Sequence, residues 1–223
     1  MTTPLRAGVL FDVDGTLADT NYLHTLAWAR AFRQSGEWAP MNAIHRLVGM
    51  GGDNLIPELL GHDSPPAAEA RTACYRDLID EARVFPGARD LVAAVHDRGL
   101  ATVLATSSPS DELDILLERL EIDEFLDAKT TADDIERSKP SPEVFLTAMK
   151  NASLDPARTL AIGDSIWDVE AARDAGIGCI GVESGGFSRH ELSEAGALHV
   201  YRDAKEILDQ LLTTPLATLS GSG

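Results

Sequence analysis

Short apolar runs that alternate with helical patterns constrain the fold of this chain more than any other feature of its sequence. The runs cover residues 8–11, 101–105, 128–130, 159–162, 179–182 and 199–201. Such alternation is typical of an α/β domain whose sheet is mostly parallel. We therefore expect a doubly wound sheet with helices on both of its faces.

A helical segment interrupts this alternation after the first run. No convincing strand pattern occurs from residue 19 to residue 83, whereas residues 22–33 and 67–82 have helical periodicity. This predicts an α-helical subdomain, residues 19–83, inserted into a core made of residues 1–18 and 84–212. Because two crossings join the insert to the core, we expect it to act as a hinged lid.

Charge and composition exclude several kinds of partner. The 223 residues include 19 Lys and Arg against 36 Asp and Glu, a formal net charge of -17 that repels nucleic acid and anionic lipid. Cys74 and Cys179 lack metal-binding spacing. Because the sequence shows neither a signal-peptide pattern nor the roughly 18 apolar residues of a membrane span, a cytoplasmic protein is expected. Its oligomeric state, monomer or dimer, is left open. Residues 213–223, rich in Thr, Ser and Gly, predict a disordered tail.

Two carboxylates directly follow the first apolar run. Asp12 and Asp14 lie two residues apart, so both side chains lie on the same side of an extended chain. Ligands of open α/β sheets bind at the carboxyl ends of the strands, where Gly15 permits a tight turn and Thr16 offers a hydroxyl and an amide. This predicts a phosphate site at these four residues. The alternative is an Asx-turn that only ends the strand.

A third carboxylate, Asp164, follows the run at residues 159–162. If Asp12, Asp14 and Asp164 converge to about 4 Å, each pair repels by roughly 4 kcal/mol at an effective dielectric near 20. A cation must then neutralise them, and an all-oxygen set favours Mg²⁺ over zinc. Asp168, one helical turn later, is expected to bind the metal indirectly, through water or by orienting a ligand. Its alternative is an ordinary acid in the first turn of a helix.

Two further segments offer groups that can bind phosphate. Thr106 follows the run at residues 101–105 and is expected to donate its hydroxyl to a phosphoryl oxygen, with Ser107 beside it as a substrate-binding candidate. Lys139 precedes a proline that keeps it out of helical geometry, just before the next helix. We expect it to clamp the phosphate, and the alternative is a solvated surface lysine.

Together these segments resemble the four motifs of the haloacid dehalogenase superfamily, and the resemblance covers nearly the whole chain. The matching residues are Asp12-Val13-Asp14-Gly15-Thr16, Thr106, Lys139 and Gly163-Asp164-Ser165-Ile166-Trp167-Asp168. Motif order and the helical insert resemble the branch that contains phosphoglycolate phosphatase and β-phosphoglucomutase. The resemblance implies a Rossmann-like core with an inserted α-helical cap.

The resemblance also implies a role for each motif residue. Asp12 is then the nucleophile that forms an aspartyl-phosphate, and Asp14 is the general acid and base whose backbone carbonyl also binds the metal. Thr106 and Lys139 are the phosphoryl clamp, and Asp164 is a magnesium ligand. The expected activity is Mg²⁺-dependent hydrolysis of the phosphate monoester of a small metabolite, as in phosphoglycolate phosphatase.

A sugar phosphomutase is the alternative activity. Residues 19–28 are similar to the first cap helix of β-phosphoglucomutase, including His24 and Trp28. Where that mutase has a metal-binding glutamate, a phosphate-binding lysine and a cap arginine, this chain has Gly163, Pro109 and Gly52. These differences favour the hydrolase.

The cap residues carry weaker predictions. Arg46 is expected to meet a carboxylate or sugar group of the substrate, with a solvated helix residue as the alternative. His24 is expected to gate Asp14, with a packed or capping histidine as the alternative. A protein without catalysis, a phosphometabolite sensor, is the alternative of another class, and the intact pair of Asp12 and Asp14 argues against it.

Overall fold

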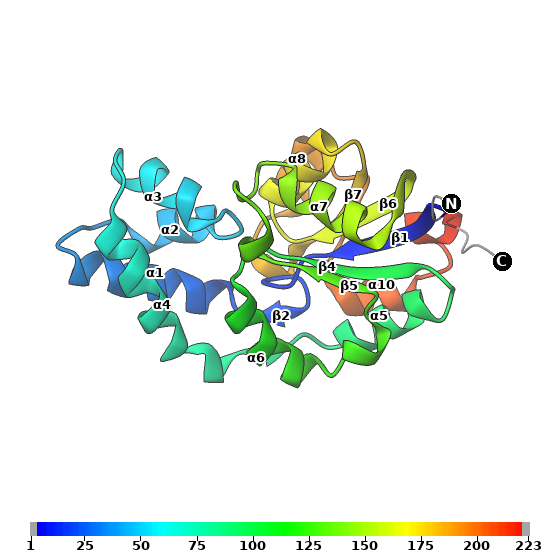
Figure 1. Ribbon diagram of the computed structural model, residues 1–223, viewed down its shortest axis with the longest axis horizontal. Coiled ribbons are helices and arrows are strands. Elements are labelled where there is room, and N and C mark those ends of the chain that lie inside the picture. The colour runs from blue at the N-terminus through cyan, green and yellow to red at the C-terminus, as the bar shows by residue number, and fades with distance from the viewer. Residues whose placement is uncertain (1–3, 220–223) are drawn as a thin grey trace.

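The computed structural model describes residues 4–219, and its centre is a six-stranded parallel sheet (Figure 1). The strands, in spatial order, are β5 (Ala128–Thr130), β4 (Ala101–Ala105), β1 (Arg6–Phe11), β6 (Leu154–Gly163), β7 (Gly178–Val182) and β8 (His199–Tyr201). Each predicted apolar run is one of these strands. The predicted α/β fold class with a doubly wound, Rossmann-like sheet is confirmed.

Helices cover both faces of the sheet because its central strands are apolar on both sides. Val9 and Phe11 of β1 belong to one buried cluster and Leu10, between them, belongs to the other. Such burial on both faces is typical of parallel strands. The first cluster includes residues of α5 (Ala88–His96), α6 (Ser110–Leu120) and α10 (Ala204–Asp209), and the second includes residues of α7 (Glu143–Ala152), α8 (Ile166–Asp174) and α9 (Arg189–Ala195).

The strand order brings the polar strand ends together. β1 lies between β4 and β6, with Phe11 opposite Leu104 on one side and Ile162 on the other. The residues that follow these positions, Asp12 and Asp164 among them, therefore emerge side by side at one edge of the sheet. This is the crevice in which open α/β sheets bind their ligands.

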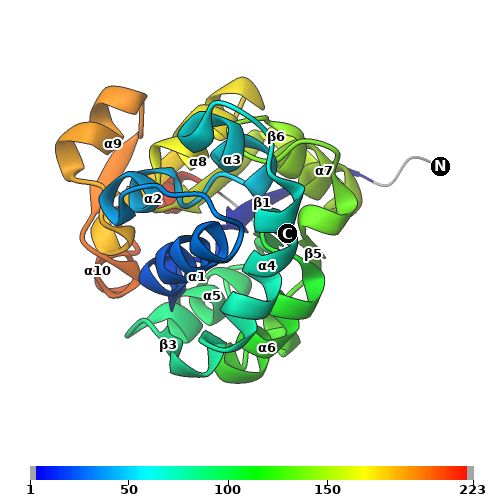
Figure 2. The same ribbon diagram turned by 90° about the vertical axis from the view of Figure 1, so that its left-hand side faces the viewer.

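The inserted segment forms a separate group of helices at this edge. The chain leaves through β2 (Ala18–Asp19) and returns through β3 (Arg83–Val84), which pair antiparallel with each other. Between them lie α1 (Asn21–Gln34), α2 (Met41–Leu47), α3 (Gly52–Leu60), α4 (Pro65–Arg76) and the 3₁₀ turn η1 (Ile79–Glu81). Figure 2, seen from their side, shows α1 to α4 in front of the sheet. The domain limits at residues 18/19 and 83/84 stay a prediction.

The carboxyl-terminal segment differs from the prediction. Residues 213–219 were expected to be disordered, but Pro215–Thr218 form a short 3₁₀ helix, η5, and Leu216 is fully buried in the cluster that includes Leu91 and Ile207. An apolar anchor within a polar stretch explains the error. Residues 220–223 of the predicted tail lie outside the described residues. Within residues 4–219, no helix is both long and apolar enough to cross a membrane.

Replacing Leu104 by alanine tests the packing that supports the site. Leu104 is completely buried in β4, so Leu104→Ala should lower the free energy of unfolding by about 2–5 kcal/mol. Leu212 is 82% exposed, and Leu212→Ala should change it by less than about 0.5 kcal/mol. Urea unfolding of both variants measures the difference. Equal losses would contradict the assignment of β4 to the core.

Candidate active site

Asp12 lies at the centre of the site, at the carboxyl end of β1. Its backbone N–H donates to the carbonyl of Ile162 at 2.9 Å, which continues the pairing with β6. The ammonium group of Lys139 lies 2.5 Å from Asp12 Oδ1 and 2.7 Å from Asp168 Oδ1. Because Lys139 is only 1% exposed, this ammonium group is a fixed charge beneath the carboxylate of Asp12. The alternative of a solvated surface lysine is wrong.

Three buried carboxylates converge around this lysine. Oxygen atoms of Asp12, Asp164 and Asp168 all lie within 4.8 Å of one another. Lys139 supplies one positive charge against three potential negative charges. The remaining negative charge favours the binding of a hard cation, which prefers oxygen ligands. The residues present therefore fit Mg²⁺. In the structure Asp168 belongs to this group of carboxylates, close enough to bind the metal directly. The contact of the Asp14 backbone carbonyl with the metal stays a prediction.

Burial changes the protonation of these groups. Burial raises the pKa of Asp12 to about 7, although the charge of Lys139 opposes the change. Burial and the neighbouring Asp168 and Asp12 raise the pKa of Asp164 well above its usual value. Burial alone would lower the pKa of Lys139, but Asp12 and Asp168 raise it above its usual value, so the lysine stays charged. A divalent cation would favour the ionised carboxylates.

Gly163 creates the space that Asp168 occupies. Ser165 caps α8, and Asp168 Oδ2 accepts from the Ser165 amide at 3.1 Å and from its hydroxyl at 2.5 Å. A Cβ atom on Gly163 would lie 2.4 Å from Asp168 Cγ. Asp168 is therefore both a capping acid and a partner of Lys139, and a residue larger than glycine at position 163 would displace it.

Three side chains donate to the carboxylate of Asp14. They are Thr20 Oγ1 at 2.5 Å, His24 Nε2 at 2.9 Å and Ser108 Oγ at 2.7 Å. Burial alone would raise the pKa of Asp14, but the interaction with His24 and the hydrogen bonds from Thr20 and Ser108 lower it. In this arrangement Asp14 is ionised and its carboxylate is held in one position.

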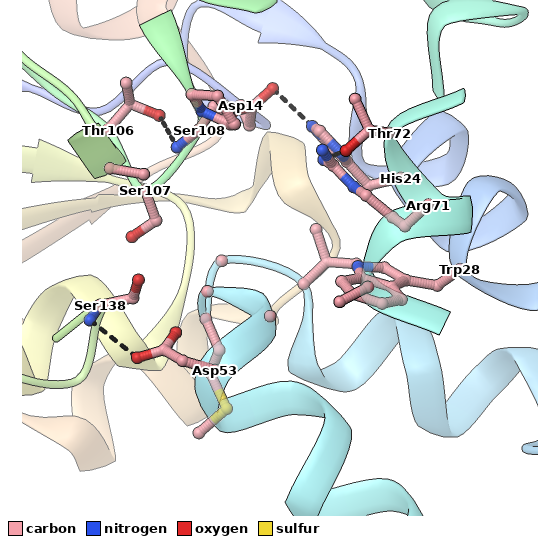
Figure 3. A pocket seen from close by; sticks show the side chains of 18 of the residues that line it. Asp14, His24, Trp28, Asp53, Arg71, Thr72, Thr106, Ser107, Ser108 and Ser138 are labelled. Atoms are coloured by element: carbon pink, nitrogen blue, oxygen red, sulfur yellow. Dashed lines mark hydrogen bonds and ion pairs between the residues drawn. The ribbon is translucent and has the colours of Figure 1, made fainter. Parts of the chain in front are cut away.

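A further hydrogen bond joins His24 to Arg71, and Figure 3 shows the two side chains beside each other. Arg71 Nη2 lies 2.7 Å from His24 Nδ1. Because arginine only donates, Nδ1 accepts, and Nε2 carries the proton that is donated to Asp14. Arg71 Nη1 also donates to the carboxylate of Glu112 on α6. We call the series Glu112, Arg71, His24 and Asp14 the polar chain.

Sequence reasoning missed Arg71 and Glu112. Glu112 lies in the first turn of α6, where an acidic residue is common for helix stability alone. Arg71 lies in the middle of α4, 41 positions earlier in the sequence. No local spacing connects the two, because only the packing of the cap against the core brings them together.

A cavity of about 250 Å³ lies between the cap and the strand ends. Of the predicted residues, Asp12, Asp14, His24, Thr106 and Ser107 line it. Ser107 Oγ is buried and has no hydrogen-bond partner within residues 4–219, which leaves it available to a ligand. Thr106 Oγ1 accepts from the Ser108 amide at 3.0 Å, so its own proton is free to donate.

Gly15 and Thr16 lie beside the carboxylates and not on the cavity wall. Gly15 has φ of +76°, and a Cβ atom there would lie 2.5 Å from Asp164 Oδ2. Thr16 Oγ1 donates to Asp12 Oδ2 at 3.3 Å. These two residues position Asp12 and Asp164, while their contact with substrate stays a prediction.

Arg46 lies outside the wall of this cavity, and its contact with substrate stays a prediction. From α2 its side chain reaches the core segment that contains Phe187 and Glu191. Its guanidinium lies 3.9 Å from the centre of the Phe187 ring, and Nη2 lies 2.5 Å from Glu191 Oε1. Arg46 therefore connects the cap to α9, and Arg71 is the arginine that faces the cavity.

Comparison with known proteins identifies the family. The family model for haloacid dehalogenase-like hydrolases matches residues 7–176, and the chain belongs to this family. A phosphoglycolate phosphatase from Pseudomonas putida is 31% identical over 188 residues, which cover 79% of this chain and 69% of the relative. The predicted enzyme class, a phosphoric monoester hydrolase of this superfamily, is confirmed.

Solved structures agree with this assignment. A hydrolase from Pseudomonas syringae has a TM-score of 0.87 and 33% identity, covering 92% of this chain and 97% of its own. CbbY from Rhodobacter sphaeroides, a mutant solved in complex with xylulose-(1,5)bisphosphate, has a TM-score of 0.75 and 29% identity, with coverage of 91% and 96%. Both comparisons include the sheet and the helical insert.

Gly163→Ala tests whether the position of Asp168 matters for activity. The added Cβ displaces Asp168 from Lys139, and a misplacement of about 1 Å in such a site lowers kcat/KM by roughly 10²-fold. Gly176→Ala is the control, because that Cβ meets no atom within 4 Å, although φ is +77°. It should lower stability and leave kcat/KM unchanged. Phosphate release assays measure both, and equal activity of the two variants would contradict the role of Gly163.

Proposed function

We propose that this protein is a Mg²⁺-dependent phosphatase that hydrolyses the phosphate monoester of a small metabolite through an aspartyl-phosphate on Asp12. One observation carries the proposal: the buried carboxylate of Asp12 lines a small cavity and is held between a charged lysine and two further carboxylates. The volume of about 250 Å³ is below the roughly 300–1,000 Å³ of pockets for drug-sized ligands, which favours a small substrate.

In the first step, a carboxylate oxygen of Asp12 attacks phosphorus, and the bond between phosphorus and the leaving oxygen breaks. Asp14, which is ionised in this structure, has to take up a proton when the substrate binds, and it gives that proton to the leaving oxygen. Thr106 and Ser107 donate hydrogen bonds to phosphoryl oxygens. Lys139 pairs with the carboxylate of Asp12 before the attack and keeps its positive charge beside the acyl phosphate that forms. When bound, Mg²⁺ would neutralise negative charge on the carboxylates and on the phosphoryl group.

In the second step, water attacks the phosphorus of the aspartyl-phosphate and Asp14 takes a proton from that water. The free carboxylate of Asp12 and inorganic phosphate result. The ionised state of Asp14 in this structure suits this basic role. Acid and base catalysis of this kind contributes typically about 10²–10⁴ in rate.

A phosphomutase is the second candidate, and the contact of His24 with Asp14 favours it. In a mutase the aspartyl-phosphate meets a substrate hydroxyl in place of water, and a cap residue that touches the general base helps to exclude water. Phosphate release from a panel of metabolite phosphates, with an assay of glucose 6-phosphate formed from β-glucose 1-phosphate, separates the two. Isomer formation without phosphate release would contradict the hydrolase.

Asp12→Asn tests the nucleophile. An amide of the same size keeps the packing but cannot attack phosphorus, so turnover should fall to background while the circular dichroism spectrum stays unchanged. Asp114→Asn is a matched control, because Asp114 forms only an exposed ion pair with Lys129, and its activity should equal that of the wild type. Substantial turnover by Asp12→Asn would contradict the proposed mechanism.

Removal of Mg²⁺ tests the metal site. Chelation should abolish phosphate release, and added Mg²⁺ should restore it. Because a ligand that binds the folded state raises its stability, Mg²⁺ should also raise the Tm of the wild type. Asp164→Asn should remove most of this rise. Full activity in the presence of chelator, or an equal rise in Tm for both proteins, would contradict the assignment.

A further inference from the structure

The part of the cavity that faces the cap has an unusual balance of charge. Within residues 4–219, Arg71 is the one arginine or lysine on the cavity wall, whereas Asp12, Asp14 and Asp53 all contribute carboxylates to it. Asp12 and Asp14 lie at the reaction centre. Arg71 and Asp53 are therefore the charged residues that face the part of the substrate beyond its phosphate group. Figure 3 shows both on the cap side.

The charge of Arg71 is already neutralised. Its guanidinium pairs with Glu112, whose side chain is only 1% exposed, and it lies 4.7 Å from the centre of the Tyr75 ring. A second phosphate or a carboxylate on the substrate would have to compete with Glu112 for the same guanidinium. Such competition leaves a buried carboxylate without its partner, which is strongly unfavourable.

Asp53 adds a negative charge at the opposite wall. The backbone amide of Ser138 donates to Asp53 Oδ2 at 3.1 Å, which fixes the carboxylate. Asp53 Oδ1 receives no hydrogen bond from any residue between 4 and 219. An ionised carboxylate only accepts hydrogen bonds, so it binds hydroxyl groups and repels anions.

Most of the remaining cap wall is apolar, with Trp28, Val48, Met50 and Ala68 beside the polar Thr72, and it lies close to the loop that carries Asp53. A Cβ atom on Gly52 would lie 3.0 Å from the six-membered ring of Trp28. Glycine therefore allows this loop to pack directly on the indole, at the position where an arginine was expected for a mutase. On its cap side the cavity therefore has an apolar surface and one hydrogen-bond acceptor, Asp53. Among the described residues, this side has no positively charged side chain that is not already paired.

We propose that Glu112 and Asp53 restrict this site to the monophosphates of uncharged, hydroxyl-bearing molecules such as sugars and polyols, and that they exclude bisphosphates and phosphocarboxylates. This inference rests on the proposed function. It separates the chain from the relatives named above, since phosphoglycolate carries a carboxylate and xylulose-1,5-bisphosphate carries a second phosphate. Both compounds are therefore poor substrates here.

Matched substrates test the inference. Glycerol 3-phosphate and 3-phosphoglycerate differ mainly by a hydroxymethyl group in place of a carboxylate, and a hexose 6-phosphate differs from its 1,6-bisphosphate by one phosphate. The wild type should prefer the uncharged member of each pair by at least about tenfold in kcat/KM. An aryl phosphate measures the phosphatase activity itself.

Two variants then test the residues. Glu112→Gln frees the charge of Arg71, and Asp53→Asn removes the repelling charge, so each should reduce the preference by about tenfold. Asp111→Asn is the matched control, since Asp111 precedes Glu112 and pairs with Arg76 at the exposed surface, and it should leave the preference unchanged. If Glu112→Gln does not fold, Asp53→Asn, at a solvent-exposed residue, still tests the inference.

The outcomes separate this inference from the proposed function. Phosphate release from the uncharged members, with the preference reduced in both variants, supports it. Equal or greater activity on the bisphosphate or the phosphocarboxylate overturns it and leaves the phosphatase assignment intact. An unchanged preference in both variants also overturns it. No release from any compound, the aryl phosphate included, overturns both.

Discussion

A lysine ammonium group buried between two carboxylates determines the geometry of this site. Lys139 contacts Asp12 from one side and Asp168 from the other, and Asp164 lies within the same group. Removing the charge of Lys139 from this buried set would leave the carboxylates uncompensated. The parallel sheet supplies Asp12 and Asp164 at adjacent strand ends, and Gly163 supplies the space for Asp168. The site is thus a consequence of strand order and charge balance together.

The cap is connected to the same charges through short polar contacts. The side-chain amide of Asn54 on α3 donates to the carbonyls of Ser138 and Lys139 at 3.2 and 3.1 Å. On the opposite side, the polar chain links Glu112 of the core through Arg71 of the cap to Asp14. Movement of the cap would change both sets of contacts. A closed cap therefore holds the lysine loop and orients the general acid, in addition to excluding water from the reaction.

The sequence predicted the core of the site because strand ends are a local signal. An apolar run followed by a carboxylate identifies Asp12 and Asp164, and the parallel topology then places them side by side. Arg71 and Glu112 were missed, and Arg46 was not placed outside the cavity wall, because the orientation of a cap helix depends on tertiary packing, which residue spacing does not show. The buried Leu216 was missed for the same reason, since one apolar residue anchors an otherwise polar stretch.

Detection of the covalent intermediate tests the central claim most directly. A substrate with a radiolabelled phosphoryl group would be mixed with enzyme and Mg²⁺, the reaction stopped with acid within one turnover, and the labelled peptide identified by mass spectrometry. The account predicts label on the peptide that contains Asp12 and on no other, and its loss in Asp12→Asn. Turnover with no protein-bound label, or with label on another residue, would contradict the assignment of Asp12 as the nucleophile.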